Sequence, residues 1–355
     1  MALPRRSRSS ARLIRRLVFC LAATAALQAR ADVVNLIEGT TFKQGQGGAV
    51  RGTVQSESSS EVVVSLGNAT IRVPTDQIAS VEYQGQPASM QLGETRERAG
   101  QLADAAAEFA KAATEAAGKP FIVEAARFRE AKCLADLALT DPTRVGEAVG
   151  RLSAFLQTAS KGRHAAAAFE TLAKLHIHAK DYAAAEAAVA ELAKIPLAAD
   201  RAAILKARVL VKQANFAAAG AELDRLIEAS PDGSAQRREA RLTKVEALIG
   251  EKKFADAESL VRQVIADSPA EDALAQSPAY NALGDCLVAA NRPKEALLAY
   301  LHTDLLYSKD KEQHPRALHQ ISQLFRRLGQ TIRADEYAQR LKQEYPNSPW
   351  ANASQ

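Results

Sequence analysis

A frame of small and apolar residues recurs along most of this 355-residue chain and limits what the chain can fold into. In two clear copies, Ala219 and Ala257 are each followed by aliphatic residues at offsets +4 and +7 and by a proline at +12. Offsets of 4 and 7 place side chains on one face of an α-helix. Proline then ends the helix, because it has no N–H to donate. The frame therefore predicts a tandem array of helices.

Seven alanines begin copies of this frame, at intervals of 43, 37, 34, 38, 39 and 38 residues: Ala105, Ala148, Ala185, Ala219, Ala257, Ala296 and Ala334. Leu92-Gly93 and Leu283-Gly284 lie 12 to 13 residues before two of them. Leu-Gly, a small residue with an apolar one four positions later, and a closing proline together resemble the tetratricopeptide repeat, which pairs two helices in about 34 residues. The resemblance implies a mainly α fold, with a right-handed α-solenoid of about seven helix pairs over residues 88–353.

The seven alanines are expected to be packing residues. Each would lie where the two helices of a pair approach most closely, since a larger side chain there would push the helices apart. The residue four positions later would fill the groove one turn further along the same face. Each pair buries only part of its apolar stripe and the next pair buries the rest, as in other repeat arrays.

Residues 32–84 have a different pattern, with short β-branched runs separated by glycine and polar turns. Ala69, Ile71 and Val73 alternate with polar residues, and Gly67-Asn68 before them is a two-residue hairpin turn. Five strands in so short a segment predict a small five-stranded β barrel, with residues 85–87 as a linker to the helices. The order of these runs resembles small SH3-like or Sm-like barrels at the start of some exported bacterial proteins.

Residues 1–31 have the three parts of a secretory signal peptide. A basic segment precedes an apolar run from Leu17 to Leu27, and Ala29-Arg30-Ala31 is a small-residue cleavage motif. The apolar run is too short to span a bilayer, which takes about 20 residues. We therefore expect cleavage before Asp32, export to the periplasm or cell envelope, and a mature chain without a membrane span, with peripheral envelope association left open.

The net charge of +5 belongs to this leader. Its seven arginines leave 39 basic and 41 acidic side chains in the rest of the chain. A mature chain of net charge −2 lacks the positive field that nucleic acid requires, so nucleic acid is not an expected partner.

Motifs of catalysis and metal binding are missing from the sequence. It has no His-Glu-x-x-His, Gly-x-Ser-x-Gly, Cys-x-x-Cys or phosphate-binding Gly-Lys-Ser/Thr motif. We therefore predict a protein that is not an enzyme and that needs no cofactor or metal.

The surface left for function is the concave face, which the first helix of each pair forms. Polar residues counted outward on that face are the predicted partner-binding residues: Arg208, Lys212, Glu246, Asn281, Asp285, His319, Gln323 and Arg326. Mixed polar side chains of this kind can hold an extended peptide or a helix of another protein. The sequence thus predicts an exported, non-enzymatic adaptor or scaffold. The alternative is an envelope polymer-binding or spacer protein in which the β segment does the binding.

Overall fold

The computed structural model describes residues 31–352. The predicted signal peptide therefore lies outside the described residues, except for Ala31. The described chain divides into two compact units, a strand unit that ends at Gln86 and a helical unit that begins at Pro87.

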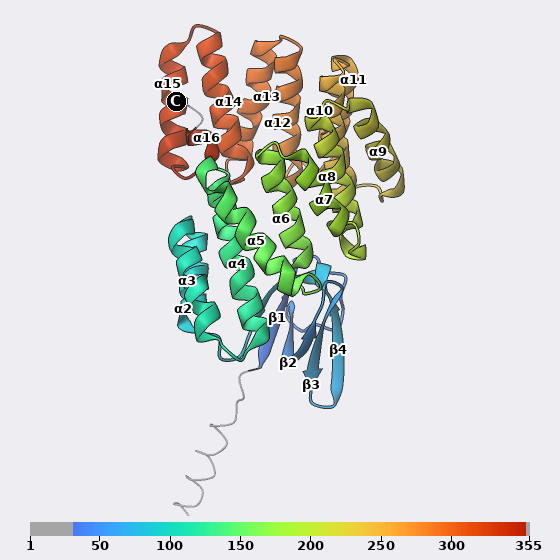
Figure 1. Ribbon diagram of the computed structural model, residues 1–355. Helices are drawn as coiled ribbons and strands as arrows, with labels where there is room; N and C mark the ends of the chain where they lie inside the picture. Colours follow the sequence, from blue (N-terminus) through green and yellow to red (C-terminus); the bar gives the residue numbers. More distant parts are fainter. Residues whose placement is uncertain (1–30, 353–355) are drawn as a thin grey trace, which may run out of the picture. The chain divides into compact units, whose positions relative to one another are not determined.

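The strand unit contains the five predicted strands, β1 (Asp32–Leu36), β2 (Ala49–Glu57), β3 (Glu61–Leu66), β4 (Ala69–Pro74) and β5 (Ile78–Glu82). They form one antiparallel sheet in the order β4-β3-β2-β1-β5. Figure 1 shows strands β1 to β4 of this sheet. The side chains that point to one face are buried, among them Val34, Val54, Val62, Val64 and Val73. This alternation gives the unit a small aliphatic core.

The sheet is open, which corrects the expectation of a barrel. Over the described residues β4 and β5 are its two edges and do not pair with each other. Closing a barrel requires strands that tilt and stagger enough for the two edges to meet. β1 and β5 have only five residues each, and their pairing shifts register between Asn35 and Leu36. Alternation along a strand predicts which side chains are buried, but not whether the two edge strands meet.

The helical unit contains seven helix pairs, as predicted, within the described residues. The first helices are α2 (Ala88–Arg98), α4 (Pro120–Ala138), α6 (Ala165–His178), α8 (Ala199–Lys212), α10 (Ala235–Gly250), α12 (Ala273–Ala289) and α14 (Gln313–Arg327). The second helices are α3 (Leu102–Glu115), α5 (Val145–Ala159), α7 (Tyr182–Leu192), α9 (Phe216–Ala229), α11 (Phe254–Asp267), α13 (Pro293–Leu306) and α15 (Thr331–Glu344). The short helix α16 (Pro349–Asn352) follows the last pair, and Figure 1 shows it beside α14 and α15.

All seven frame alanines lie in second helices, and each has an exposed fraction of 0%. We call the fourth and fifth pairs the central pairs. Their aliphatic residues at +4, Leu223 and Val261, and at +7, Leu226 and Val264, are buried with the frame alanines. A methyl group at each of these positions is therefore enclosed by both helices of its pair, so a larger side chain has no room there.

The turn between the two helices of a pair repeats as closely as the helices do. The residue five positions before the frame alanine has a left-handed backbone in six of the seven pairs: Gly100, Lys180, Ala214, Lys252, Asn291 and Gly329. A left-handed residue just after a helix ends the helix and supplies N–H groups to its last carbonyls. The exception is the second pair, where a 3-10 turn, Pro142–Arg144, stands in its place. The longest interval between frame alanines, 43 residues, ends at this pair.

Candidate functional site

The first helices of the later pairs turn one stripe of side chains toward a common open face. On α10 this stripe includes Leu242, Glu246 and Ile249, at offsets of 4 and 3 residues. On α12 it includes Pro278 and Asp285. These offsets are those of one helix face, so neighbouring first helices line a shared depression.

Two hollows, of about 580 and 560 Å³, lie along this face, within the usual range for ligand sites. Their lining residues come from α6, α8, α10, α12 and α14, from the segment just before α14, and from Trp350. We call the two hollows together the groove. Six residues line both of them: Glu246, Ile249, Asp285, Glu312, Gln313 and Arg316. No second helix contributes to either lining, so the groove belongs to the first helices.

Four of the eight predicted partner-binding residues line the groove: Arg208, Lys212, Glu246 and Asp285. His319 lies outside its lining, with its ring 5.5 Å from that of Trp350. Gln323 and Arg326 are exposed further along α14, and Arg326 forms an ion pair of 2.9 Å with Asp335 of α15. The structure thus gathers the predicted residues of α8 and α10 and Asp285 of α12, but not Asn281 of α12 or those of α14.

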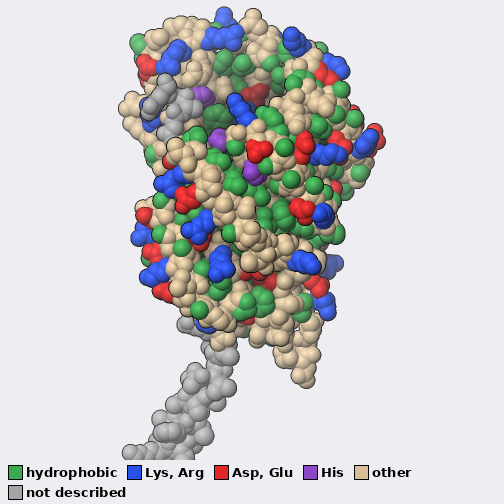
Figure 2. Space-filling model, in the orientation of Figure 1, with side chains coloured by type: hydrophobic (Ala, Val, Ile, Leu, Met, Phe, Trp, Pro, Cys, Tyr) green, Lys and Arg blue, Asp and Glu red, His purple; other side chains and the backbone are tan. Residues whose placement is uncertain are grey.

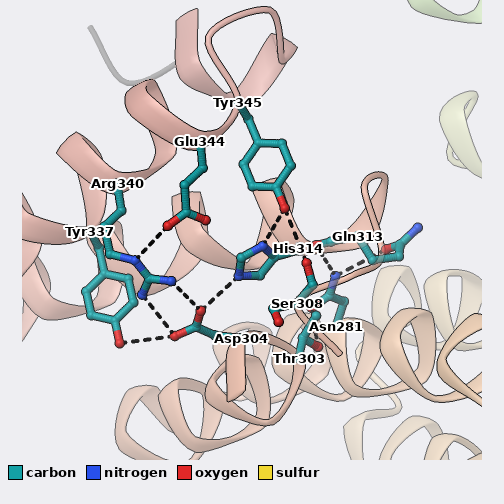
Figure 3. Close-up of polar contacts among 10 residues, drawn as sticks. All are labelled: Asn281, Thr303, Asp304, Ser308, Gln313, His314, Tyr337, Arg340, Glu344 and Tyr345. Carbon is teal, nitrogen blue, oxygen red and sulfur yellow. Dashed lines mark hydrogen bonds and ion pairs between the residues drawn. The ribbon is translucent and has the colours of Figure 1, made fainter. Parts of the chain in front are cut away.

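Asn281 was expected to face a partner, but it is fully buried. Its amide nitrogen donates to the backbone carbonyl and the side-chain oxygen of Gln313, at 3.0 and 3.1 Å, and its amide oxygen accepts from Thr303 at 3.0 Å (Figure 3). All of these partners are inside the protein. Asn281 is therefore a buried connector that holds the start of α14, and hence the groove wall at Gln313, against α12.

A second set of buried polar groups lies beside Asn281 at the junction of the last two pairs. His314 Nε2 lies 2.8 Å from Asp304 Oδ1, and its Nδ1 lies 2.7 Å from the hydroxyl of Tyr345 (Figure 3). The side chains of His314 and Asp304 are 1% and 3% exposed. Arg340 donates to both oxygens of Asp304, at 3.0 and 3.2 Å. Burial alone would raise the pKa of Asp304, but the hydrogen bonds from His314 and Arg340 lower it to about 2.

Arginine–carboxylate pairs link successive first helices along the groove. Arg208 of α8 pairs with Glu239 of α10 at 3.1 Å, and Arg238 of α10 lies 3.8 Å from Asp272, the N-cap of α12. Arg316 of α14 pairs with Asp285 of α12, which also accepts a hydrogen bond from Tyr300 at 2.7 Å.

Between α6 and α8, Arg201 and Glu170 repeat this pairing at 3.3 Å. These pairs satisfy most of the charged groups of the groove from within the chain. On the face shown in Figure 2, basic and acidic side chains are intermixed in the same way, with hydrophobic side chains between them.

The apolar side chains of the groove were missed in the sequence. Leu242, Ile249, Leu274 and Pro278 line it, and Leu274 is 81% exposed. The outward positions were chosen for polar character, so leucine and isoleucine on the same stripe were left out of the predicted site. The offsets from Glu246 to Leu242 and to Ile249, 4 and 3 residues, were the signal that could have found them.

Residues 31–352 contain neither a metal-binding cluster nor a membrane-spanning helix. No group of three or more histidine, cysteine, aspartate or glutamate side chains there is arranged to hold a metal ion. None of the helices in that range is long and apolar enough to cross a membrane.

An array of helix pairs with an open groove on its first helices defines a class of repeat protein, and solved structures identify its fold. The chain matches a tetratricopeptide repeat protein from Parabacteroides merdae with a TM-score of 0.50 and 12% sequence identity, over 75% of this chain and 97% of that chain. The helical unit therefore has the tetratricopeptide-repeat fold.

Two further matches are less similar in structure. One is the Rap protein complexed with competence and sporulation factor, with a TM-score of 0.46, 14% identity, and coverage of 74% of this chain and 76% of that chain. The other is PilW, a type IV pilus biogenesis factor, with a TM-score of 0.41, 16% identity, and coverage of 65% and 97%. Neither carries an argument about function. No protein-family model matches the chain, and neither does any curated protein.

Proposed function

We propose that this chain is a non-enzymatic scaffold whose groove binds a segment of another protein. The observation that carries the proposal is the groove lining, which comes from five first helices and leaves apolar and charged side chains open to solvent. Extended surfaces of this kind suit a peptide or helix that lies across several repeats. An enzyme would need a water-excluding site with a reactive group, and the polar groups of the groove are mostly paired with each other.

The proposal includes export, for which the leader sequence is the support. Residues 1–31 have the pattern of a secretory signal, and cleavage would leave Asp32 as the first residue. In the structure the Asp32 carboxylate accepts hydrogen bonds from the backbone N–H groups of Val54 and Gln84, at 2.8 and 2.6 Å. A mature chain that begins at Asp32 would keep both bonds. The alternative, polymer binding by the strand unit, stays a prediction.

Site-specific photocrosslinking in the producing cells tests the scaffold function. A photoreactive residue replaces Lys212 in the groove and, in the matched control, Glu228, which is exposed on the second helix α9. We expect a discrete protein adduct from position 212 and none from 228. Adducts from neither position, or equal adducts from both, would refute the groove as the binding site.

Cell fractionation with N-terminal sequencing tests export separately. We expect an extracytoplasmic protein that starts at Asp32. A cytoplasmic protein that keeps residues 1–31 would refute export and leave the crosslinking result standing.

A further inference from the structure

Negative charge in the groove exceeds positive charge once internal pairs are removed. Within residues 31–352, Glu246 and Glu312 are exposed groove residues without an ion-pair partner. The carboxylate of Asp310, also in the lining, is bonded only by Ser277 and by backbone N–H groups. Lys212 is the single groove cation in the same range that has no ion pair. Three carboxylates therefore stand against one ammonium group.

The positive charge of Arg316 does not offset this excess, because Arg316 is already paired with Asp285. Burial lowers the pKa of Arg316, but the charges of Asp285 and Tyr300, the hydrogen bond to Asp285 and the charge of Glu246 together outweigh that effect, so the pKa is raised. Arg316 thus pairs with Asp285, while Glu246, at the wall that the two hollows share, has no ion-pair partner within residues 31–352. A cation from a bound partner could therefore pair with the carboxylates at this wall without displacing a cation of the chain itself.

Apolar surface lies next to these carboxylates in the larger of the two linings. Leu274 is 81% exposed, and Leu242, Pro278 and Ala282 line the same hollow. Covering an exposed leucine with an apolar side chain stabilises the complex by roughly 25 cal/mol for each Å² of apolar surface removed from water. The groove therefore offers an apolar floor and an acidic wall together.

The outer face of α13 was the other apolar candidate. Leu298, Leu305 and Leu306 are 60%, 73% and 64% exposed there. Nothing in the structure indicates what would cover them, and the face lacks the charge arrangement that the groove provides. It supplies instead a matched control, because its leucines are exposed to a similar degree as Leu274.

We propose that the groove takes a partner segment in which a lysine or arginine is flanked by apolar residues. The cation lies at the wall formed by Glu246 and Glu312, and a neighbouring apolar side chain lies on Leu274 and Leu242. An acidic segment is disfavoured, because it would meet three carboxylates in the same hollow. This inference rests on the proposed function and adds the chemistry of the partner segment.

Selection from a display library of random peptides of about twelve residues tests the inference, with the purified full chain as bait. We expect the selected peptides to be enriched in Lys or Arg next to Leu, Ile, Val or Phe. Their dissociation constants should rise about 5- to 10-fold in the Glu246→Gln, Glu312→Gln double variant, which corresponds to about 1 kcal/mol for the lost charge interactions. The same peptides should lose about 5-fold in affinity for Leu274→Ser.

Control variants remove the same groups outside the groove. Glu228→Gln with Glu336→Gln takes two exposed carboxylates from α9 and α15, and Leu305→Ser takes an exposed leucine from α13. These variants should bind the selected peptides as the parent chain does. Equal losses in the control and groove variants would overturn the inference.

The outcomes separate this inference from the function on which it rests. Peptides that bind the groove but are acidic, or whose affinity does not change in the Glu246→Gln, Glu312→Gln variant, would overturn the basic–apolar segment and leave the scaffold function intact. A chain that selects no peptide, and that gives no adduct from position 212 in cells, would overturn both.

Discussion

The sixth helix pair, α12 and α13, uses the same frame as the central pairs but fills it with different side chains. Four residues after the frame alanine the central pairs carry Leu223 and Val261, whereas the sixth pair carries Tyr300. Twelve residues before the alanine the central pairs carry Ala207 and Val245. The sixth pair has a glycine there, Gly284, and a Cβ added to it would lie 2.5 Å from the Tyr300 ring.

The first pair has the same combination of an aromatic residue at +4 and a glycine at −12. Phe109 stands at the position of Tyr300, and Gly93 stands at the position of Gly284, where an added Cβ would lie 2.7 Å from the Phe109 ring. Aromatic residues at +4 thus occur with glycine at −12 in both pairs. In these two pairs the second helix fills space that a side chain of the first helix fills in the central pairs.

A polar residue in place of an apolar one also distinguishes the sixth pair from the central pairs. Eight residues after the frame alanine the central pairs carry Ile227 and Ile265, which pack against the core, whereas the sixth pair carries Asp304. The buried His314 of the next pair faces that carboxylate. A buried histidine–carboxylate hydrogen bond therefore replaces an apolar contact at one junction only among these three.

The residue twenty positions before the alanine differs between the last pair and the two pairs before it. Arg237 and Gln276 occupy it in the fifth and sixth pairs, and each donates to carbonyls at the end of the preceding second helix, Ser230 O at 3.1 Å and Ser268 O at 2.9 Å. His314 stands there in the last pair and contacts the Asp304 side chain instead. Each departure from the frame thus has a matching departure on the neighbouring helix, so the unit of the repeat is the contact pair rather than the single residue.

Replacing Asp304 by the central residue, Asp304→Ile, is expected to have the largest effect. His314 would lose its hydrogen-bond partner while remaining buried, and Arg340 would lose the buried carboxylate with which it pairs; removal of one partner from a buried ion pair costs about 3–5 kcal/mol. Urea unfolding followed by circular dichroism measures the free energy of unfolding. The double variant Asp304→Ile with His314→Gln should recover most of the loss, because it makes this junction resemble the central ones, and Arg340 keeps Glu344 at 3.2 Å.

Two results would contradict this comparison. If Asp304→Ile alone costs under about 1 kcal/mol, then His314 finds another partner and the pair is not the stabilising contact. If the double variant is no more stable than the single one, the junction depends on more than the exchange of these two residues.

Much of the helical fold was predictable because its packing is local and periodic. The frame alanines, the aliphatic residues after them and the closing prolines follow from the pitch of one helix, so a single sequence contains the information. The seven pairs are confirmed. Closure of the strand unit was not predictable, because it depends on whether two edge strands meet, and no residue type on β4 or β5 marks that contact.

The site was only partly predictable, for a different reason. Counting along a helix predicts which residues share a face, and it placed Glu246 and Asp285 beside the groove. It does not predict which polar residues a neighbouring pair covers. Asn281 is buried because α13 and the start of α14 lie over it, with Thr303 and Gln313 as its partners.

Adding one methyl group at Gly284 tests whether the glycine is needed to make room for the Tyr300 ring. Gly284→Ala should destabilise the protein by about 1–3 kcal/mol, because the Tyr300 ring is fully buried and its hydroxyl is bonded to Asp285. Gly220→Ala is the control, since nothing lies within 4 Å of a Cβ added to that glycine in α9. It should stabilise the protein by roughly 0.5–1 kcal/mol through helix propensity alone.

The double variant Gly284→Ala with Tyr300→Leu gives this position the central arrangement. It should be more stable than Gly284→Ala, as thermal or urea unfolding would show. Equal destabilisation by Gly284→Ala and Gly220→Ala would mean that the ring does not limit the space at the helix crossing.

Acid should affect the last junction more than the central ones. Since the pKa of Asp304 in the folded chain is about 2, below the ordinary value of about 3.9, the unfolded chain takes up this proton first as the pH falls. The stability that the group contributes is therefore fully present above about pH 4 and is lost as the pH falls toward about 2. This contribution is at most about 2.6 kcal/mol, because the shift from about 3.9 to about 2 is about 1.9 pKa units of about 1.36 kcal/mol each.

Urea unfolding across this pH range, in the parent chain and in the Asp304→Ile, His314→Gln variant, isolates that contribution. Other carboxylates lower the stability of both proteins in acid, so the difference between the two curves reports the Asp304 contact. The variant should lose less stability than the parent between about pH 4 and pH 2, and the difference between the curves should level off near about pH 5. Parallel curves over the whole range would mean that His314 and Arg340 do not lower the pKa of the Asp304 carboxylate. The polar and apolar junctions would then respond to acid alike.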